Sequence, residues 1–201
     1  MKKLIVLGWI VLMLASVAWT QEKLEAPVWN VGDKWAYKSA TGGTWTSEIV
    51  EIKEGLLIEK RQGSKELYAY DATTLNLKSM INESGRQSKP TWVLRKLFDF
   101  PIFVGKTWSD TTYSTPARSQ NEVTYIHDFK VEGIEEVSTA AGTFKAYKIH
   151  YKQTNLSSHN NGWIIFWYSP DVKNWMKREV ENVTYWQGSY QTAELTSHKV
   201  K

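Results

Sequence analysis

The 201-residue sequence contains no cysteine and only four histidines, and this scarcity narrows the chemistry available to it. The absence of cysteine excludes disulfide bonds, thiolate metal sites and cysteine nucleophiles. No histidine pair has the H-x-x-x-H or H-x-x-E-H spacing of a metal site; the four are His127, His150, His159 and His198. His127 alternates with Tyr125 and Phe129 along an apolar strand face, which predicts a buried, hydrogen-bonded core residue. We predict neither a metal nor a cofactor.

Motifs of the common catalytic centres are also missing. The chain has no G-x-S-x-G elbow, no S-x-x-K pair and no glycine-rich phosphate loop. Two carboxylates about 5 to 10 Å apart can hydrolyse glycosides, and Glu179 and Glu181 share one strand face. Lys177 precedes them on that face, which favours a solvated charged surface instead. We predict a protein without catalytic residues, and a hydrolase that uses acidic residues is a minor alternative.

The positive charge of the chain is small once its first residues are set aside. The calculated pI is 9.0, but removing Lys2 and Lys3 with a signal peptide leaves 23 basic against 21 acidic residues. Acidic and basic residues alternate, as in residues 51–54, whereas a phosphate-binding surface needs clustered positive charge. We therefore predict no nucleic-acid partner.

The first 18 residues have the layout of a secretory signal peptide. Two lysines precede an apolar run of about eleven residues, Leu4 to Leu14, and small residues follow at Ser16 and Ala18. The run is shorter than the ~20 residues of a membrane-spanning helix. An uncleaved anchor is the alternative, and a lipid-anchored lipoprotein is excluded because no cysteine follows. The sequence predicts a bacterial periplasmic or secreted protein that is not an integral membrane protein after cleavage.

Residues 19–201 read as a single, mainly antiparallel β domain. Runs rich in Val, Ile, Thr, Tyr and Trp alternate with turn residues, and no stretch of twelve residues has convincing helical spacing. The fold class is an open barrel or strongly curved sheet, favoured by the long segments 122–137 and 143–153; a two-sheet sandwich is the alternative. Residues 92–100 are predicted as a short helix or an extended connection, and 83–90 as a loop. Strands are expected over residues 35–37, 45–53, 56–61, 66–71, 75–81, 107–113, 122–137, 143–153, 163–168 and 173–183. A last strand is expected after residues 187–189 and ends at about residue 200.

One motif occurs twice, at a separation of 73 residues. Residues 31–35 and 104–108 share the pattern V-G-x-x-W, each at the start of an expected strand. Two interpretations stay open: two pseudo-equivalent lobes, 27–100 and 101–201, or a common way to begin a strand.

Aromatic residues make up 13% of the chain, with 11 tryptophans, and they supply the candidate binding site. Both faces of strand 163–168 are apolar, which predicts a central strand covered on both sides. Asn161-Gly162 suits a type I′ turn, and pairing across it would place Tyr147 and Tyr151 beside the Trp163 face. These aromatic residues form either a plain core or the inner face of a ligand cavity. The candidate ligand-binding residues are Trp35, Tyr37, Trp108, Tyr147, Tyr151, Trp163 and Trp167.

Four segments carry a family resemblance: VGDKWAYK (31–38), FPIFVGKTWSD (100–110), STAAGTFKAYKIHY (138–151) and WYSPDVKNWMKRE (167–179). Together they resemble the TapB-like exported bacterial proteins of unknown function. The resemblance implies a curved antiparallel sheet like that of the periplasmic lipoprotein carriers, whose concave face holds acyl chains. It supplies no active site.

Two functions are therefore expected. The first is a non-catalytic binding or carrier protein for a lipid or another apolar or amphipathic ligand. The alternative is a structural or adaptor module that binds an envelope protein or polysaccharide through aromatic side chains.

Overall fold

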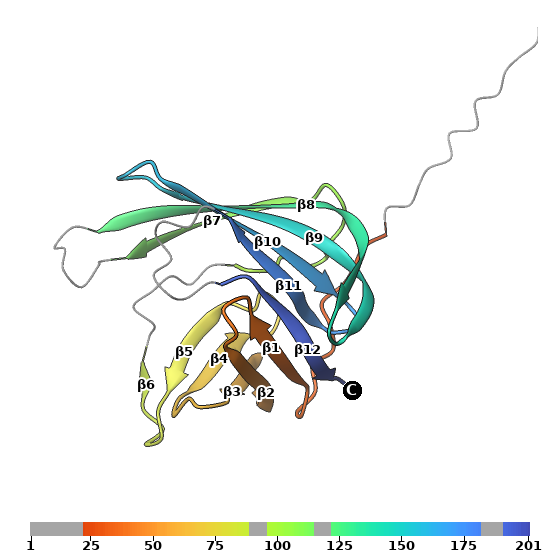
Figure 1. Cartoon of the computed structure of the whole chain (residues 1–201). Coiled ribbons are helices and arrows are strands. Elements are labelled where there is room, and N and C mark those ends of the chain that lie inside the picture. Colours follow the sequence, from red (N-terminus) through yellow and green to blue (C-terminus); the bar gives the residue numbers. More distant parts are fainter. Residues whose placement is uncertain (1–21, 89–95, 115–121, 182–190) are drawn as a thin grey trace, which may run out of the picture.

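The computed structural model describes residues 22–88, 96–114, 122–181 and 191–201, and these build one open antiparallel sheet (Figure 1). The predicted signal peptide, residues 89–90 of the predicted loop and residues 92–95 of the expected helix or connection lie outside the described residues. Residues 96–99 are not helical. The strands are β1 Lys34–Ser39, β2 Thr44–Lys53, β3 Leu56–Arg61, β4 Leu67–Asp71, β5 Leu77–Ile81, β6 Gln87–Ser88, β7 Thr107–Ser114, β8 Val123–Thr139, β9 Gly142–Asn155, β10 Asn161–Ser169, β11 Asn174–Glu181 and β12 Ala193–Lys199.

The sheet consists of two meanders of six strands that join side by side. Its strand order is β6-β5-β4-β3-β2-β1-β12-β11-β10-β9-β8-β7, so β1 pairs with β12 at the centre. No pairing links β6 to β7 in the described residues, which leaves the sheet open at these two edges. The predicted antiparallel, open and curved architecture is confirmed. The polar loop predicted over 83–90 includes the short strand β6, which sequence periodicity alone does not reveal.

The two V-G-x-x-W segments build the same turn. The amide of Gly32 donates to the carbonyl of Ile49, and the amide of Gly105 donates likewise to that of Val131, both at 2.8 Å. Both glycines have positive φ, 91° and 87°, which is why glycine recurs at this position. Each turn introduces the first strand of one meander. This common geometry agrees with either interpretation of the repeat, and the division into two lobes stays a prediction.

Strands β8 and β9 bend over the sheet, as Figure 1 shows. The pairing register of β8 shifts between Val131 and Gly133, so Gly133 lies at the bend that its sequence position predicts. Beyond this bulge, Val137 and Ala146 are buried in the same cluster as Trp167. The end of the β8–β9 hairpin therefore covers a sheet face opposite to the one that carries Tyr147.

The predicted turn between β9 and β10 is wrong in position. Asn161 and Gly162 already belong to β10, where they pair with Thr154 and Gln153. The residue with positive φ in this connection is His159, at 56°. The hairpin itself forms, but its loop is longer than a two-residue turn.

The observed register shows which faces of β9 and β10 meet. Tyr151 pairs with Ile164, and Tyr147 pairs with Tyr168. Directly opposed residues of an antiparallel pair share a face, so the two tyrosines do not lie beside the Trp163 face. A two-residue turn at Asn161-Gly162 would pair Asn160 with Trp163, and it would likewise match odd-numbered residues of β9 with even-numbered residues of β10. The predicted face is therefore wrong for either turn.

Buried residues fill much of the concave, inner face. The cluster at the β7–β10 end includes Trp108, Phe129, Tyr147, Tyr151 and Tyr168 and is completed by a segment outside the sheet. Phe98 and Ile102 of that segment are fully buried in the cluster. The inner face of β7–β10 is thus a packed core rather than an open cavity.

The loop between β4 and β5 depends on one carboxylate. Asp71 Oδ1 accepts hydrogen bonds from the amides and hydroxyls of both Thr73 and Thr74, at 2.7 to 3.0 Å. Burial opposes the charged form, but these hydrogen bonds outweigh it and lower the pKa of Asp71 from 3.8 to about 2. A lowered pKa stabilises the fold above pH 4, and this contribution is lost as the pH falls from about 4 to 2.

We expect Asp71→Asn to lower the free energy of unfolding by about 1–2 kcal/mol at pH 7, because the site is partly exposed and solvent weakens the effect. The difference from the unsubstituted protein should shrink at pH 2.5. Urea unfolding followed by circular dichroism at both pH values measures this. Glu83→Gln, at an exposed position, is the control. An Asp71→Asn effect that does not depend on pH would contradict this assignment.

Candidate functional site

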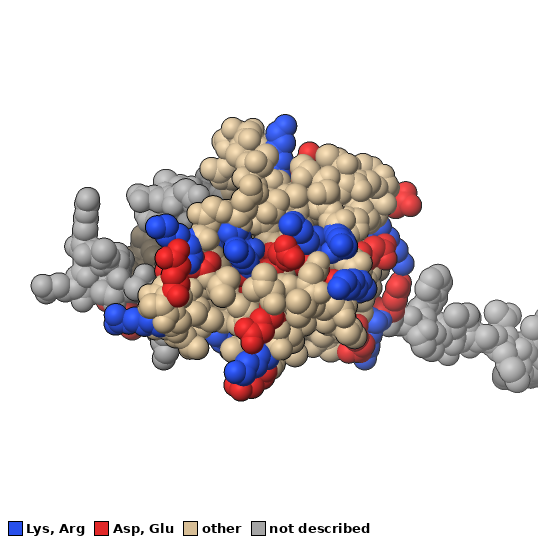
Figure 2. Space-filling model, turned by 90° about the horizontal axis from the view of Figure 1, so that it is seen from below, with Lys and Arg blue, Asp and Glu red and all other residues tan. Residues whose placement is uncertain are grey.

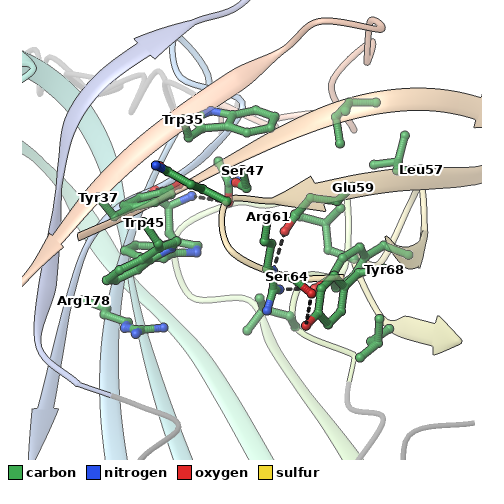
Figure 3. A pocket seen from close by; sticks show the side chains of 18 of the residues that line it. Trp35, Tyr37, Trp45, Ser47, Leu57, Glu59, Arg61, Ser64, Tyr68 and Arg178 are labelled. Atoms are coloured by element: carbon green, nitrogen blue, oxygen red, sulfur yellow. Dashed lines mark hydrogen bonds and ion pairs between the residues drawn. The ribbon is translucent and has the colours of Figure 1, made fainter. Parts of the chain in front are cut away.

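A pocket of about 750 Å³ remains on the inner face of the other half of the sheet (Figure 3). Its walls come from β1 to β5, with further side chains from β10, β11 and the segment before Ile102. Its lining includes the aromatic residues Trp29, Trp35, Tyr37, Trp45, Tyr68, Tyr70, Phe166 and Trp175. Its polar lining residues include Ser39, Thr44, Ser47, Glu59, Arg61, Gln62, Ser64, Asn174, Arg178 and Gln191.

The strand register gives this pocket an apolar end. Leu57 pairs with Tyr70, which pairs with Leu77, so these three lie in line across β3, β4 and β5. Leu75 and Leu97 line the pocket from the neighbouring loops. This end is suited to a hydrocarbon group because its lining is mainly aliphatic.

The opposite end of the pocket is polar. Ser39 pairs with Ala193, which pairs with Arg178, so these residues lie in line across β1, β12 and β11. Trp35 and Leu57 lie in the upper part of the close-up in Figure 3, and Arg178 lies at its lower left. The pocket is therefore amphipathic along its length.

Three stacked aromatic rings form the wall between these ends. The Tyr37 ring lies 4.1 Å from that of Trp175 and 5.4 Å from that of Trp45, with interplanar angles of 21° and 23°. The Tyr37 hydroxyl donates to the Trp175 carbonyl at 3.1 Å. Burial, followed by the negative charge of Glu59, raises the pKa of Tyr37 well above its usual range. Tyr37 is thus a neutral hydrogen-bond donor at physiological pH.

A second polar group lies on β3 and β4. Arg61 forms an ion pair with Glu59 at 2.6 Å and donates a hydrogen bond to the Tyr70 hydroxyl. Its guanidinium lies 4.1 Å from the centre of the Tyr68 ring. Burial lowers the pKa of Arg61, but the adjacent Glu59 carboxylate outweighs it and the pKa lies above its ordinary value. These partners hold the Arg61 side chain in a fixed position on the pocket wall.

The structure brings two of the seven candidate binding residues to the pocket. Trp35 and Tyr37 line it. Three others, Trp108, Tyr147 and Tyr151, lie in the packed cluster at the β7–β10 end. Trp163 and Trp167 do not line the pocket, because they alternate on β10 with Phe166, which does. The role of all seven in ligand binding stays a prediction.

Several pocket residues escape a reading of local periodicity. Trp45, Trp175, Arg61 and Arg178 line the pocket, but none is among the candidates from the sequence. Their strands were expected, and the alternation of Trp45 with Ser47 and Ile49 is visible in the sequence. The missing information is which strands lie opposite one another around the concave face.

His127, the histidine predicted to be buried on an apolar strand face, has a structural role. His127 is fully buried; its Nε2 lies 2.7 Å from Thr112 Oγ1 and its Nδ1 lies 2.8 Å from the Tyr151 hydroxyl. The predicted buried, hydrogen-bonded histidine is confirmed. Within the described part of the chain, no three histidine, aspartate or glutamate side chains are grouped as metal ligands would be.

Basic and acidic side chains are interspersed on the molecular face shown in Figure 2. Exposed pairs such as Lys34 and Glu48, 3.2 Å apart, contribute to this mixture. The described residues include no helix long and apolar enough to cross a bilayer.

A family model described as DUF3108-like matches residues 105–184. The chain is thus similar to this family over the segment that contains β7 to β11. An uncharacterised family is supported, as predicted, whereas the match does not confirm a TapB-like assignment. No curated protein shows significant sequence similarity to the chain.

Solved structures with a related arrangement include three bacterial proteins. The hypothetical lipoprotein YmcC from Escherichia coli (K12) has 12% identity and a TM-score of 0.47, over 73% of this chain and 74% of its own. A Bacteroides fragilis NCTC 9343 protein, named as exported with a YmcC-like fold, has 12% identity and a TM-score of 0.39, over 88% and 99%. A Parabacteroides distasonis ATCC 8503 protein, named as a lipoprotein, has 15% identity and a TM-score of 0.39, over 89% and 100%.

Proposed function

We propose that this chain is a non-catalytic, exported binding or carrier protein for an apolar or amphipathic ligand. The observation that carries the proposal is the 750 Å³ pocket, which stays open although the neighbouring inner face is filled. Pockets of about 300–1,000 Å³ with aromatic walls and a few polar groups are typical of small-molecule sites. The signal peptide predicted over residues 1–18 supports a periplasmic or extracellular location.

The adaptor function receives less support from the arrangement of the tryptophans. None of the tryptophans in the described ranges is among the exposed residues. An adaptor that binds through aromatic side chains needs accessible indoles on a convex or flat surface. Here the aromatic side chains instead line a concave pocket or fill the core.

Filling the pocket provides a direct test. Ser47 is 5% exposed and lies at the middle of the pocket, between its pairing partners Trp35 and Arg61. We expect Ser47→Trp to raise the dissociation constant for N-phenyl-1-naphthylamine, a neutral apolar fluorophore, by at least about tenfold, since the added indole occupies the cavity. Fluorescence titration measures this effect.

The matched control adds the same indole to the outer face of the same strand. Glu48 is half exposed, so Glu48→Trp should leave the fluorophore affinity within about twofold. Native mass spectrometry of protein purified from its own cell envelope should also show a bound apolar molecule that the Ser47→Trp variant lacks. A ligand-free protein that binds no apolar fluorophore would refute the proposed function.

A further inference from the structure

One buried hydroxyl in the pocket wall has no hydrogen-bond partner. Ser47 is 5% exposed and lines the pocket, and no group in the described ranges of the chain bonds to its Oγ. Its strand neighbours on this face are already engaged: the Trp35 indole donates to Val172, and the Arg61 guanidinium pairs with Glu59. Because buried polar groups are normally hydrogen-bonded, this hydroxyl indicates where a polar atom of a ligand lies.

Two indole N–H groups of the pocket are also available. Trp29 and Trp35 donate theirs to backbone carbonyls, at 2.9 and 2.8 Å. The N–H groups of Trp45 and Trp175, which line the same pocket, have no acceptor in the part of the chain that the structure describes. An indole N–H is only a donor, so a ligand can satisfy these two groups only with acceptor atoms.

Three side-chain amides in the lining also present donors. The Gln191 side-chain oxygen accepts from the Thr41 hydroxyl at 2.8 Å, and that of Asn174 accepts from the Trp175 backbone amide at 2.8 Å. The Gln62 side-chain oxygen accepts from a threonine hydroxyl at 3.2 Å. None of the three NH2 groups has an acceptor among the described residues. The free polar groups of the lining are therefore mainly donors.

The formal charges beside Ser47 are paired. Arg61, the partner of Ser47 on β3, lies 2.6 Å from Glu59, and a dashed line joins the two in Figure 3. A charged ligand group at Ser47 would be repelled by one member of this pair. An uncharged oxygen can instead accept from the free O–H and N–H groups without this cost.

We propose that the ligand of this pocket is an uncharged amphipath whose polar part is rich in oxygen acceptors, as in an ester or a sugar. This part would lie at Ser47, Trp45 and Trp175, and the hydrocarbon chain would extend toward Leu57 and Leu77. The inference rests on the proposed function, and it adds the chemistry and orientation of the ligand.

Chain-matched ligands test the headgroup. Dodecanoylglycerol, dodecyl glucoside, dodecan-1-ol, dodecanoate and dodecyltrimethylammonium would each compete with the bound neutral fluorophore, all below their micellar and solubility limits. We expect the ester, the glucoside or both to bind at least about tenfold more tightly than the alcohol, the gain of about two further hydrogen bonds. Neither charged compound should bind as tightly as the better of these two. Comparison of the ester with the glucoside identifies the headgroup.

Substitutions at Ser47 and Trp45 test the donors. Ser47→Ala and Trp45→Phe should each reduce the preference over the alcohol by about threefold or more, because each removes one donor. Ser47→Thr keeps a hydroxyl and should retain most of the preference. Ser197→Ala is the control, since Ser197 is exposed and does not line the pocket, and it should retain the full preference.

A stability measurement separates a binding role of Ser47 from a structural one. Without ligand, Ser47→Ala should unfold at the same or a higher urea concentration than the unsubstituted protein, because its hydroxyl has no intramolecular hydrogen bond to lose. A clear loss of stability would assign the hydroxyl to the fold and contradict its role in binding.

The outcomes also separate the two proposals. Three results overturn the headgroup assignment and leave the proposed function standing: equal affinity for the alcohol and both oxygen-rich compounds, tightest binding of either charged compound, or a preference that survives in folded Ser47→Ala and Trp45→Phe proteins. Failure of every probe, including the neutral fluorophore, to bind the unsubstituted protein overturns both.

Discussion

Replacing Asp33 by alanine should lower the free energy of unfolding by about 3–5 kcal/mol, because it leaves a mostly buried lysine without its counterion. Asp33 is fully buried, and its Oδ2 lies 3.0 Å from Lys173 Nζ, whose side chain is 12% exposed. The same carboxylate accepts the amides of Asn30 and Lys201, both at 2.9 Å. Removal of Asp33 therefore breaks one ion pair and leaves two backbone donors unsatisfied. Urea unfolding followed by circular dichroism measures the change.

The contacts of Asp33 and Lys173 connect segments that are far apart in the chain. Lys173 also donates to the carbonyl of Val28 at 2.8 Å, so it joins the residues before β1 to the turn before β11. The exposed ion pair between Lys34 and Glu48 is the control for this buried pair. Glu48→Gln, which removes the partner of Lys34, should change the free energy of unfolding by less than about 1 kcal/mol. Asp33→Asn combined with Lys173→Met should cost less than the sum of the two single changes. An Asp33→Ala protein as stable as the unsubstituted one would contradict this interpretation.

Strand positions in this chain follow from local sequence patterns. Alternation with period two marks β2, β3, β8 and β9 within a few residues of their observed bounds, because one face of each strand is buried. Pairing of neighbours is also local, since consecutive strands of a meander are joined by short turns. The antiparallel fold class is therefore predictable without knowledge of distant contacts.

The face that each aromatic residue occupies depends on the pairing register of its strand. Asn161-Gly162 favours a two-residue turn, but both residues continue β10 and the connection passes through His159. The buried faces of both strands override the local turn preference. The hairpin is confirmed, but the prediction that Tyr147 and Tyr151 lie beside the Trp163 face is wrong. Odd-numbered residues of β9 pair with even-numbered residues of β10, and a two-residue turn at Asn161-Gly162 would give the same alternation.

The pocket depends on contacts between distant parts of the chain. Arg178 reaches it because β11 lies beside β12, which pairs with β1 from the other end of the sequence. The cavity also depends on what fills the rest of the inner face. Phe98 and Ile102 fill the β7–β10 end, and no period in their sequence indicates this packing. Trp35 and Tyr37 are predictable as inward-facing residues, but the position of the open space is not.

Trp35 is the pocket residue whose loss should affect folding most. It is 1% exposed, and its indole N–H donates to the Val172 carbonyl at 2.8 Å across the junction of the two meanders. Trp35→Ala should lower the free energy of unfolding by about 3–5 kcal/mol, because it removes a large buried ring and leaves a cavity. Trp35→Phe should cost about 1–3 kcal/mol, since Val172 then loses its donor.

Trp45 offers the matched comparison, because it lines the same pocket but is only partly buried. Its ring stacks on Tyr37 and lies beneath Arg178, so Trp45→Ala should weaken binding of the neutral fluorophore by several-fold. Its stability cost should be smaller than that of Trp35→Ala, since solvent already reaches part of the ring. Urea unfolding and fluorophore titration on both variants measure the two effects separately. If Trp35→Ala unfolds at the same urea concentration as the unsubstituted protein, the junction between β1 and the turn before β11 does not stabilise the fold.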